Sequence, residues 1–168
     1  MTSTQARRMR RPVLQAEVDA GAGCVGAHPD MFFRGDGAPL LVWQEQRTEA
    51  LRFCHGCPAR AACEELALRD GDGTNHDDMV RGGRSGTELA ARRKAQARRI
   101  SAAIAADTAS GEEWNKLTDL TAKLHRAAGL NRRLEFQAQH NERVDELRAD
   151  LAAVRSARRA RTGWEVAA

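Results

Sequence analysis

Apolar residues recur at intervals of three and four along much of the chain, a spacing that is typical of amphipathic helices. This periodicity is read together with the prolines and glycines that start and stop helices. In the first two thirds of the sequence it predicts four helices, over residues 13–20, 40–53, 58–69 and 85–106. Ser85 and Glu88 form a plausible capping box at the start of the last one. Residues 1–12 are expected to be a disordered basic arm.

The last third of the chain carries two further apolar stripes with helical spacing. They lie on either side of Gly129 and comprise Leu117, Leu120, Leu124 and Ala127, then Val144, Leu147, Leu151 and Val154. Two such stripes predict a helical hairpin or a short coiled-coil seam. Because the seam is shorter than two heptads, we expect at most weak self-association through these helices.

The pattern as a whole predicts an all-α fold in which three folded parts follow the arm. They are a small helical domain at residues 13–83, a basic helix at 84–106 and a helical extension of unassigned role at 107–168, which is expected to begin as a separate segment after Ser110-Gly111.

The composition limits how far burial alone can stabilise this fold. Of the 168 residues 31 are alanine, and the chain has four Phe, three Trp and no Tyr. Such a chain forms helices readily but buries only a thin core. It contains no run of 18 apolar residues that could cross a membrane, and its N-terminal arginines lead into a polar stretch rather than a secretory signal. We therefore expect a cytoplasmic protein that is held together by something besides hydrophobic burial.

The net charge of +4 conceals a change of sign along the chain. Residues 12–83 carry six basic and twelve acidic side chains, whereas residues 84–99 carry six basic groups and one acid. Basic segments that flank an acidic centre are typical of proteins that work near nucleic acid. The alternative is that the arginine-rich helices are simply solvated.

The predicted helix over residues 85–106 has one narrow apolar stripe. On a helical wheel Leu89, Ile100 and Ile104 fall together, and only Arg93 intrudes on that side. Such a helix can rest on its own domain through the stripe and contact DNA phosphates through the cations of the opposite arc. These cations are Arg92, Lys94, Arg98 and Arg99.

Four cysteines form the most specific pattern in the sequence. Their spacing is C-x29-C-x2-C-x5-C, all within the acidic section: Cys24, Cys54, Cys57 and Cys63. In a cytoplasmic protein, clustered cysteines are more often metal ligands than structural disulfides. The turn at His55-Gly56 brings the middle pair together, whereas the first cysteine must come from a distant loop. Joint ligation would therefore tie separate segments of the chain together.

The spacing alone leaves three chemistries open. Four thiolates with irregular spacing fit an iron–sulfur cluster. A zinc site usually has two short cysteine pairs, and only one is present here. The Cys54–Cys57 pair could also be a redox dithiol. A complete cysteine set needs no histidine ligand, so we interpret three histidines as turn or surface residues: His28, His55 and His76.

The residues around the cysteines resemble those of the WhiB-like family of actinobacterial and phage transcription regulators. The resemblance covers about residues 13–100 and rests on the cysteine spacing and on its flanking motifs, which are His28-Pro29-Asp30-Met31-Phe32-Phe33, Cys54-His55-Gly56-Cys57-Pro58-Ala59-Arg60 and Gly82-Gly83 before a basic helix. It implies that the four cysteines hold a [4Fe-4S] cluster in a small all-helical domain. It also implies sensitivity of the cluster to oxygen or nitric oxide, and control of transcription through the C-terminal domain of the primary sigma factor.

The turn before the basic helix departs from the family pattern. That turn normally reads Gly-Val-Trp-Gly-Gly, and here Arg81 replaces the tryptophan. In family members this aromatic residue lies close to the cluster and contributes to the sigma-factor contact, so its loss bears on the strength or identity of the partner. We expect the partner surface to include Phe32, Phe33, Arg81, Gly82 and Gly83, with core packing as the alternative for the two phenylalanines.

The sequence therefore predicts a redox- or nitric-oxide-responsive [4Fe-4S] regulator that acts with the sigma factor and binds DNA through basic residues. No catalytic residue is assigned. One alternative is a protein disulfide reductase that uses the Cys54/Cys57 pair of the cluster-free form, although the chain lacks the strand and helix alternation of a thioredoxin-like fold. The other alternative is a zinc-stabilised DNA-binding module.

Overall fold

The computed structural model describes residues 1–71, 78–130 and 136–162, with side chains described up to residue 160. The chain divides into two compact units, Met1–Asp107 and Thr108–Ala168. The described residues are mostly helical, and their two strands have two residues each, which confirms the predicted all-α class. In the described parts of the chain, no helix has an apolar stretch long enough to cross a membrane.

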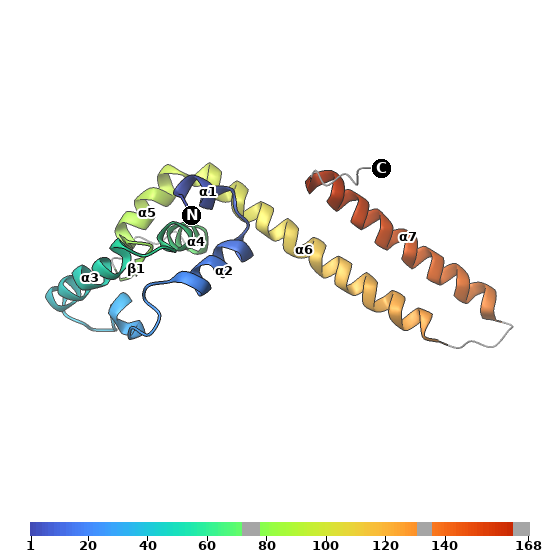
Figure 1. Ribbon diagram of the computed structural model, residues 1–168, viewed down its shortest axis with the longest axis horizontal. Helices are drawn as coiled ribbons and strands as arrows, with labels where there is room; N and C mark the ends of the chain where they lie inside the picture. Colours follow the sequence, from blue (N-terminus) through green and yellow to red (C-terminus); the bar gives the residue numbers. More distant parts are fainter. Residues whose placement is uncertain (72–77, 131–135, 163–168) are drawn as a thin grey trace. The chain divides into compact units, whose positions relative to one another are not determined.

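The first unit is built around one central helix, α4 (Arg60–Asp70). This helix packs against α1, α2, α5 and β1, which surround it in Figure 1. The other elements of the unit are α1 (Ser3–Arg8), α2 (Arg11–Gly21), the 3-10 helix η1 (Pro29–Phe32), α3 (Leu40–His55), β1 (Val80–Arg81), β2 (Arg84–Ser85), α5 (Gly86–Ala95) and the beginning of α6 (Ala97–Ala128). The two strands pair antiparallel as a hairpin.

Small clusters of buried side chains take the place of one large core in this unit. Ala62 and Leu66 of α4 pack with the N-terminal helices, and Ala67 and Leu68 pack with α5 and α6. A separate cluster joins Trp43 of α3 to β1. A divided core of this size is what an alanine-rich composition predicts, and it leaves polar contacts to connect the clusters.

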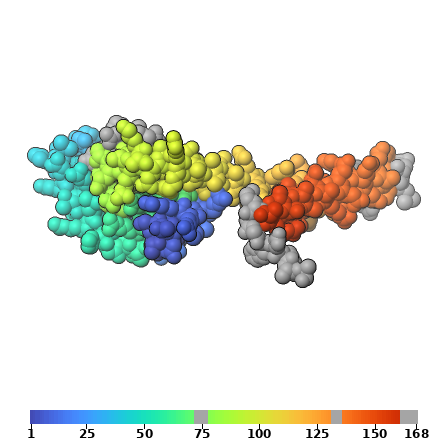
Figure 2. Space-filling view, turned by 90° about the horizontal axis from the view of Figure 1, so that it is seen from above, coloured from blue at the N-terminus to red at the C-terminus, as the bar shows by residue number. Residues whose placement is uncertain are grey.

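The N-terminal residues are folded, contrary to the disordered arm expected at residues 1–12. Thr2 and Gln5 form a capping box that starts α1, and Ala6 is fully buried in a cluster with residues of α4. Figure 2 shows the N-terminal residues, in blue, lying against the green surface of the middle of the chain. The sequence did not reveal this helix because it contains one apolar residue, whose partners Ala62 and Leu66 are distant in the chain.

The single helix predicted over residues 85–106 is two helices. The Ser85–Glu88 capping box is confirmed at the start of α5, but this helix ends at Ala95, and the backbone angles of the next residue, Gln96 (φ −115°, ψ 20°), lie outside the helical range. The N–H of Gln96 donates to the carbonyls of Arg92 and Arg93, so the end of α5 is itself hydrogen-bonded. The wheel drawn for one straight helix therefore does not describe how the cations on either side of Gln96 are arranged.

The second of these helices, α6, continues through Gly111 to Ala128, although a separate segment was expected to begin there. Outside its chain neighbours and the backbone of its own helix, no atom lies within 4 Å of the position where a side chain at Gly111 would begin. A lone glycine in a helix costs about 1 kcal/mol relative to alanine, which is too little to end a long helix. The helix break lies instead at Gln96, where no glycine or proline in the sequence indicates it.

The second unit is a helical hairpin formed by the C-terminal part of α6 and by α7 (Gln137–Thr162). Figure 1 shows these helices running side by side. The predicted stripes meet in one cluster, in which Leu120 packs with Leu147 and Leu151. The predicted hairpin is therefore confirmed. Each stripe is covered by the other within one chain, and weak self-association through these helices stays a prediction.

Candidate metal centre

The four cysteines come from separate segments of the first unit. Cys24 lies in the loop after α2, Cys54 in the last turn of α3 and Cys63 inside α4. Cys57 lies in the short connection between α3 and α4, where its N–H donates to the carbonyl of Cys54 (3.4 Å). The helix ends at His55, two residues beyond the end expected from the sequence, and the predicted turn that follows keeps the middle pair of cysteines close together.

The turn of the β-hairpin and the loop after α2 supply backbone hydrogen bonds to three of the sulfurs. The backbone of Gly83 bonds to Cys54, and that of Gly82 bonds to Cys63. The N–H of Gly23 donates to the Sγ of Cys57 (3.3 Å). Hydrogen bonds of this kind stabilise negative charge on sulfur, so the turn and the loop bring hydrogen-bonding groups to three of the candidate ligands.

The hairpin turn approaches α4 so closely that glycine is required there. Gly82 and Gly83 have positive φ angles of 58° and 72°, which side chains rarely adopt. A Cβ atom at Gly82 would overlap the backbone of Glu64, and one at Gly83 would meet the side chain of Arg60. This contact places the turn beside Cys63, which directly precedes Glu64 on α4.

The electrostatic surroundings of the cysteines favour a bound cation. Burial raises the pKa of the Cys54 and Cys63 thiols, and the other cysteines raise it further because neighbouring thiolates repel one another. The guanidinium of Arg81 opposes this by lowering the pKa of Cys63. A positively charged metal centre would offset both the cost of burial and the mutual repulsion.

The four cysteines provide the type of donor that an iron–sulfur cluster uses. All four cysteines are free thiols, and in the described parts of the chain no three Cys, His, Asp or Glu side chains converge as a single ion requires. Thiolates around one zinc lie about 3.8 Å from one another, because each Zn–S bond is about 2.3 Å. A [4Fe-4S] cluster binds each thiolate through a different iron and so accepts a wider arrangement.

The histidines contribute nothing visible to this donor set. His28 is exposed and lies 3.5 Å from a carboxylate oxygen of Asp30, and His55 is exposed at the end of α3. His76 lies outside the described residues. His28 and His55 are therefore turn and surface residues, in agreement with the interpretation from the sequence.

The family model described as transcription factor WhiB matches residues 19–95. The match contains all four cysteines, the glycine turn and the whole of α5. This segment belongs to the WhiB family. The resemblance noted in the sequence is thereby confirmed, and comparisons with curated proteins and with solved structures find no match. The WhiB segment ends at the last residue of α5, so α6 and α7 lie beyond it.

Arg81, which stands where the family pattern has tryptophan, is held at the end of β1. Its guanidinium lies 3.4 Å from a carboxylate oxygen of Asp70, and its side chain is 31% exposed. The same guanidinium lowers the pKa of Cys63. Arg81 thus replaces an aromatic surface with a positive charge beside the cysteines, and the charge is shared with a carboxylate of α4.

The two phenylalanines of the WhiB segment have different surroundings, although the sequence treated them as equivalent. Phe32 packs against the cluster around Trp43, and its ring meets that of Phe53 edge to face, with centroids 6.1 Å apart. Phe33 is 47% exposed, and its backbone bridges to Met79, just before β1. Phe32 is therefore mainly a packing residue, and Phe33 is accessible to a partner.

The four cations proposed as DNA contacts also fall into two groups. Arg92 lies 3.1 Å from Glu64, and Arg99 binds the carboxylate of Glu65 through two nitrogens, at 2.7 and 3.0 Å. The remaining two, on either side of the break at Gln96, are exposed: Lys94 and Arg98. Ile104, expected on the apolar stripe, is 41% exposed, whereas Leu89 and Ile100 are buried.

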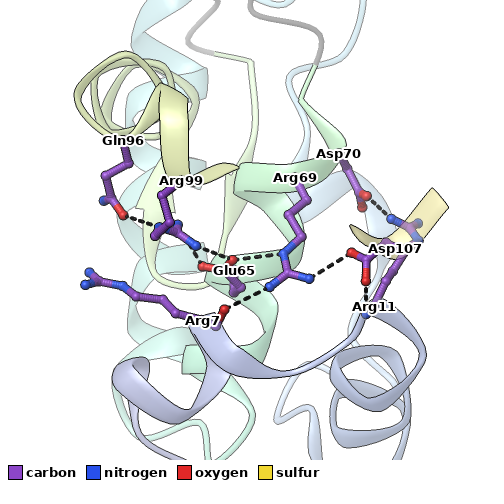
Figure 3. Close-up of polar contacts among 8 residues, drawn as sticks. All are labelled: Arg7, Arg11, Glu65, Arg69, Asp70, Gln96, Arg99 and Asp107. Atoms are coloured by element: carbon purple, nitrogen blue, oxygen red, sulfur yellow. Dashed lines mark hydrogen bonds and ion pairs between the residues drawn. The ribbon is translucent and has the colours of Figure 1, made fainter. Parts of the chain in front are cut away.

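A buried ionic network connects α4 to its neighbours. Glu65, which is 3% exposed, accepts hydrogen bonds from Arg69 (2.9 Å) and from Arg99 of α6. Arg69 also donates to Asp107 (2.8 Å) and to the carbonyl of Arg7 (3.4 Å). Figure 3 shows Glu65 and Arg69 at the centre of these contacts. One buried carboxylate thus joins α4 to α6, and its arginine partner extends the connection to α1.

The network extends to α2 and the hairpin through two further carboxylates. Asp107 accepts the backbone N–H of Arg11 (3.0 Å), and Asp70 pairs with the side chains of Arg11 and Arg81. The sequence argument did not identify this network. Its one local sign is the pair Glu65 and Arg69, which are four residues apart in a helix whose other residues are largely alanine and leucine.

Replacing Glu65 with Gln should destabilise the first unit. The change leaves two guanidinium groups without their shared carboxylate, and a broken buried ion pair costs about 3–5 kcal/mol. We expect the free energy of unfolding of the metal-free protein, measured by chemical denaturation, to fall by about 3 kcal/mol. Glu49→Gln, the same change at an exposed position of α3, should have an effect below about 0.5 kcal/mol. Equal stability of the two variants would show that the network does not hold the unit together.

Proposed function

We propose that this chain is an iron–sulfur regulator of transcription. In this proposal four cysteines hold a [4Fe-4S] cluster, a nearby surface binds the C-terminal domain of the primary sigma factor, and cations of α5 and α6 contact DNA. The observation that carries the proposal is the contact of Cys54 and Cys63 with the glycine turn, in a segment that matches the family model of transcription factor WhiB and contains all four cysteines. The ligands are Cys24, Cys54, Cys57 and Cys63.

The protein's own contacts provide a route from the cysteines to the surface. When bound, a [4Fe-4S] cluster supplies redox chemistry and reactivity toward oxygen or nitric oxide. Gly82 and Gly83 hydrogen-bond to two of the cysteines. They directly follow β1, and the residue before β1, Met79, forms a backbone bridge with Phe33. A change in the charge or position of the sulfurs therefore acts on the hairpin, and the hairpin acts on the loop that carries Phe33.

The proposed sigma-factor surface combines apolar and charged groups. Phe33 is 47% exposed, the partly exposed Arg81 follows Met79 and Val80 in β1, and Gly82 and Gly83 complete the turn. The first turn of α3 also exposes three successive apolar side chains, Leu40, Leu41 and Val42. Exposed apolar groups gathered in one unit are typical of protein-binding surfaces, and Arg81 would favour an acidic residue on the partner.

The proposed DNA contacts depend mainly on Lys94 and Arg98, because both are exposed. Arg92 and Arg99 have carboxylate partners on α4 and would have to leave them, at least in part, to bind a phosphate. A contact of this kind depends on salt concentration and reads little base sequence. Promoter choice would then come from the sigma-factor partner rather than from these two side chains.

The two alternative functions find less support. A disulfide reductase needs a reactive thiolate, and the raised pKa of Cys54 disfavours that form in the Cys54–Cys57 pair. A zinc-stabilised module needs thiolates that converge on one ion. Such sites usually have two short cysteine pairs, whereas this chain has one, and the metal analysis below separates zinc from iron.

Anaerobically purified protein should contain iron and acid-labile sulfide in the equal amounts of a [4Fe-4S] cluster. Changing Cys63 to Ser should remove most of both, because the cluster loses a ligand that α4 positions. His55→Ala is the matched control, since His55 lies between two of the ligands in the sequence but is exposed, and it should retain the iron. Stoichiometric zinc without iron in the native protein would contradict the proposal.

Phe33→Ala should weaken binding of the sigma-factor domain without lowering stability. The side chain is half exposed, so its removal affects a partner more than the core. Phe32→Ala is the comparison and should lower the free energy of unfolding by about 3 kcal/mol, because that ring is packed. Calorimetric titration of the domain, together with thermal unfolding, measures both effects. Unchanged binding by the Phe33 variant would place the interface elsewhere.

Changing Lys94 and Arg98 together to Gln should weaken duplex DNA binding at every sequence. If each contacts one phosphate, the slope of log affinity against log salt should become shallower by about two units. Lys116→Gln with Arg126→Gln removes one lysine and one arginine from exposed positions of α6 and serves as the control. An unchanged slope in the first variant, measured by fluorescence anisotropy, would mean that these residues are not the DNA contacts.

A further inference from the structure

The second unit contains a groove that the WhiB match does not reach. It has a volume of about 710 Å³ and is lined by residues of both helices of the hairpin. From α6 it is lined by Trp114, Thr118 and His125 among others, and from α7 by three arginines, Arg155, Arg158 and Arg159. All of these residues lie beyond the last matched residue, 95, so the groove has no role in the function proposed above.

Trp114 gives this groove a flat aromatic surface. The side chain is 60% exposed, although the hairpin has a buried leucine cluster in which it takes no part. The guanidinium of Arg158 lies 5.8 Å from the centroid of the indole ring. A cation at this distance is attracted by the face of the ring. The groove thus combines an exposed aromatic ring with a positive charge held against it.

The excess of positive charge on α7 is concentrated at its C-terminal end, which lines the groove. Four acids lie in residues 137–150, whereas residues 151–162 contain four arginines and no acid. Arg155, Arg158 and Arg159 are spaced by three and four, so they share one face of the helix. None of the residues that line the groove is acidic. The groove is therefore complementary to a chain of negative charges.

We propose that this groove binds single-stranded nucleic acid. The arginines would contact successive phosphates, and one base would stack on the exposed face of Trp114. Stacking of bases on aromatic side chains inside a positively charged groove is how proteins bind single strands without reading their sequence. A duplex keeps its bases stacked on one another and leaves the ring unused, and the carboxylates of an acidic protein segment would pair with the arginines without stacking on the ring.

The test uses the full-length protein and a labelled single-stranded oligonucleotide of mixed sequence, with fluorescence anisotropy at fixed salt. Changing Arg155, Arg158 and Arg159 to Gln should lower the affinity at least tenfold. The control replaces three other exposed arginines of the same hairpin, R126Q/R143Q/R148Q, which removes the same net charge. It should lower the affinity much less, because these three do not line the groove.

The tryptophan separates stacking from charge attraction. Trp114→Ala should lower single-strand affinity by about 5- to 150-fold, which corresponds to 1–3 kcal/mol per stacked base. Trp114→Phe should restore much of it, and neither change should alter binding of a duplex of the same sequence. Because Trp114 is exposed, both variants should remain folded, which thermal unfolding checks.

Four results would overturn the proposal. They are failure of the wild type to bind the single strand, equal loss in the two arginine triples, no effect of Trp114→Ala, and displacement of the strand by polyglutamate as readily as by unlabelled oligonucleotide. The last result would assign the groove to acidic polymers in general. None of these outcomes depends on iron content, on the sigma factor or on Lys94 and Arg98, so the function proposed for the WhiB segment is tested separately.

Discussion

The carboxylate of Glu65, buried between Arg69 and Arg99, is the constraint on which the first unit depends. The buried carboxylate of Glu65 and the buried guanidinium of Arg69 are tolerable because they are paired, and the partly exposed Arg99 adds a second partner to the carboxylate. The core of this unit is divided into small clusters, and α4 contributes to two of them. The ionic contacts of α4 therefore add to the stability that the burial of apolar side chains provides, and they fix α1 and α6 against the same helix.

The same helix also carries one of the four cysteines, because Cys63 directly precedes Glu64 and Glu65 on α4. Successive residues of a helix point in different directions. Cys63 accordingly interacts with the hairpin turn, Glu64 with Arg84 and Arg92, and Glu65 with α6. The position of the Cys63 thiol and the positions of α5 and α6 are thus set by neighbouring residues of a single turn.

The sequence predicted the features that local residues determine and missed those that need distant partners. The Ser85–Glu88 capping box, the turn after His55 and the two leucine stripes follow from spacing, and the structure confirms them. The helix around Ala6 and the contact of Arg69 with Asp107 join residues far apart in the chain. The spacing of apolar residues along the sequence does not predict such a contact. The different surroundings of Phe32 and Phe33 depend in the same way on tertiary packing.

The close approach of the hairpin turn to α4 has an evolutionary consequence. At Gly82 every possible mutation adds atoms where the backbone of Glu64 already lies, so the position has almost no freedom to drift. The neighbouring Arg81 faces a carboxylate and is partly exposed, and many side chains could occupy that space. The residue before the glycines can therefore be exchanged and change the chemistry of the surface, while the contact of the glycine turn with α4 is kept.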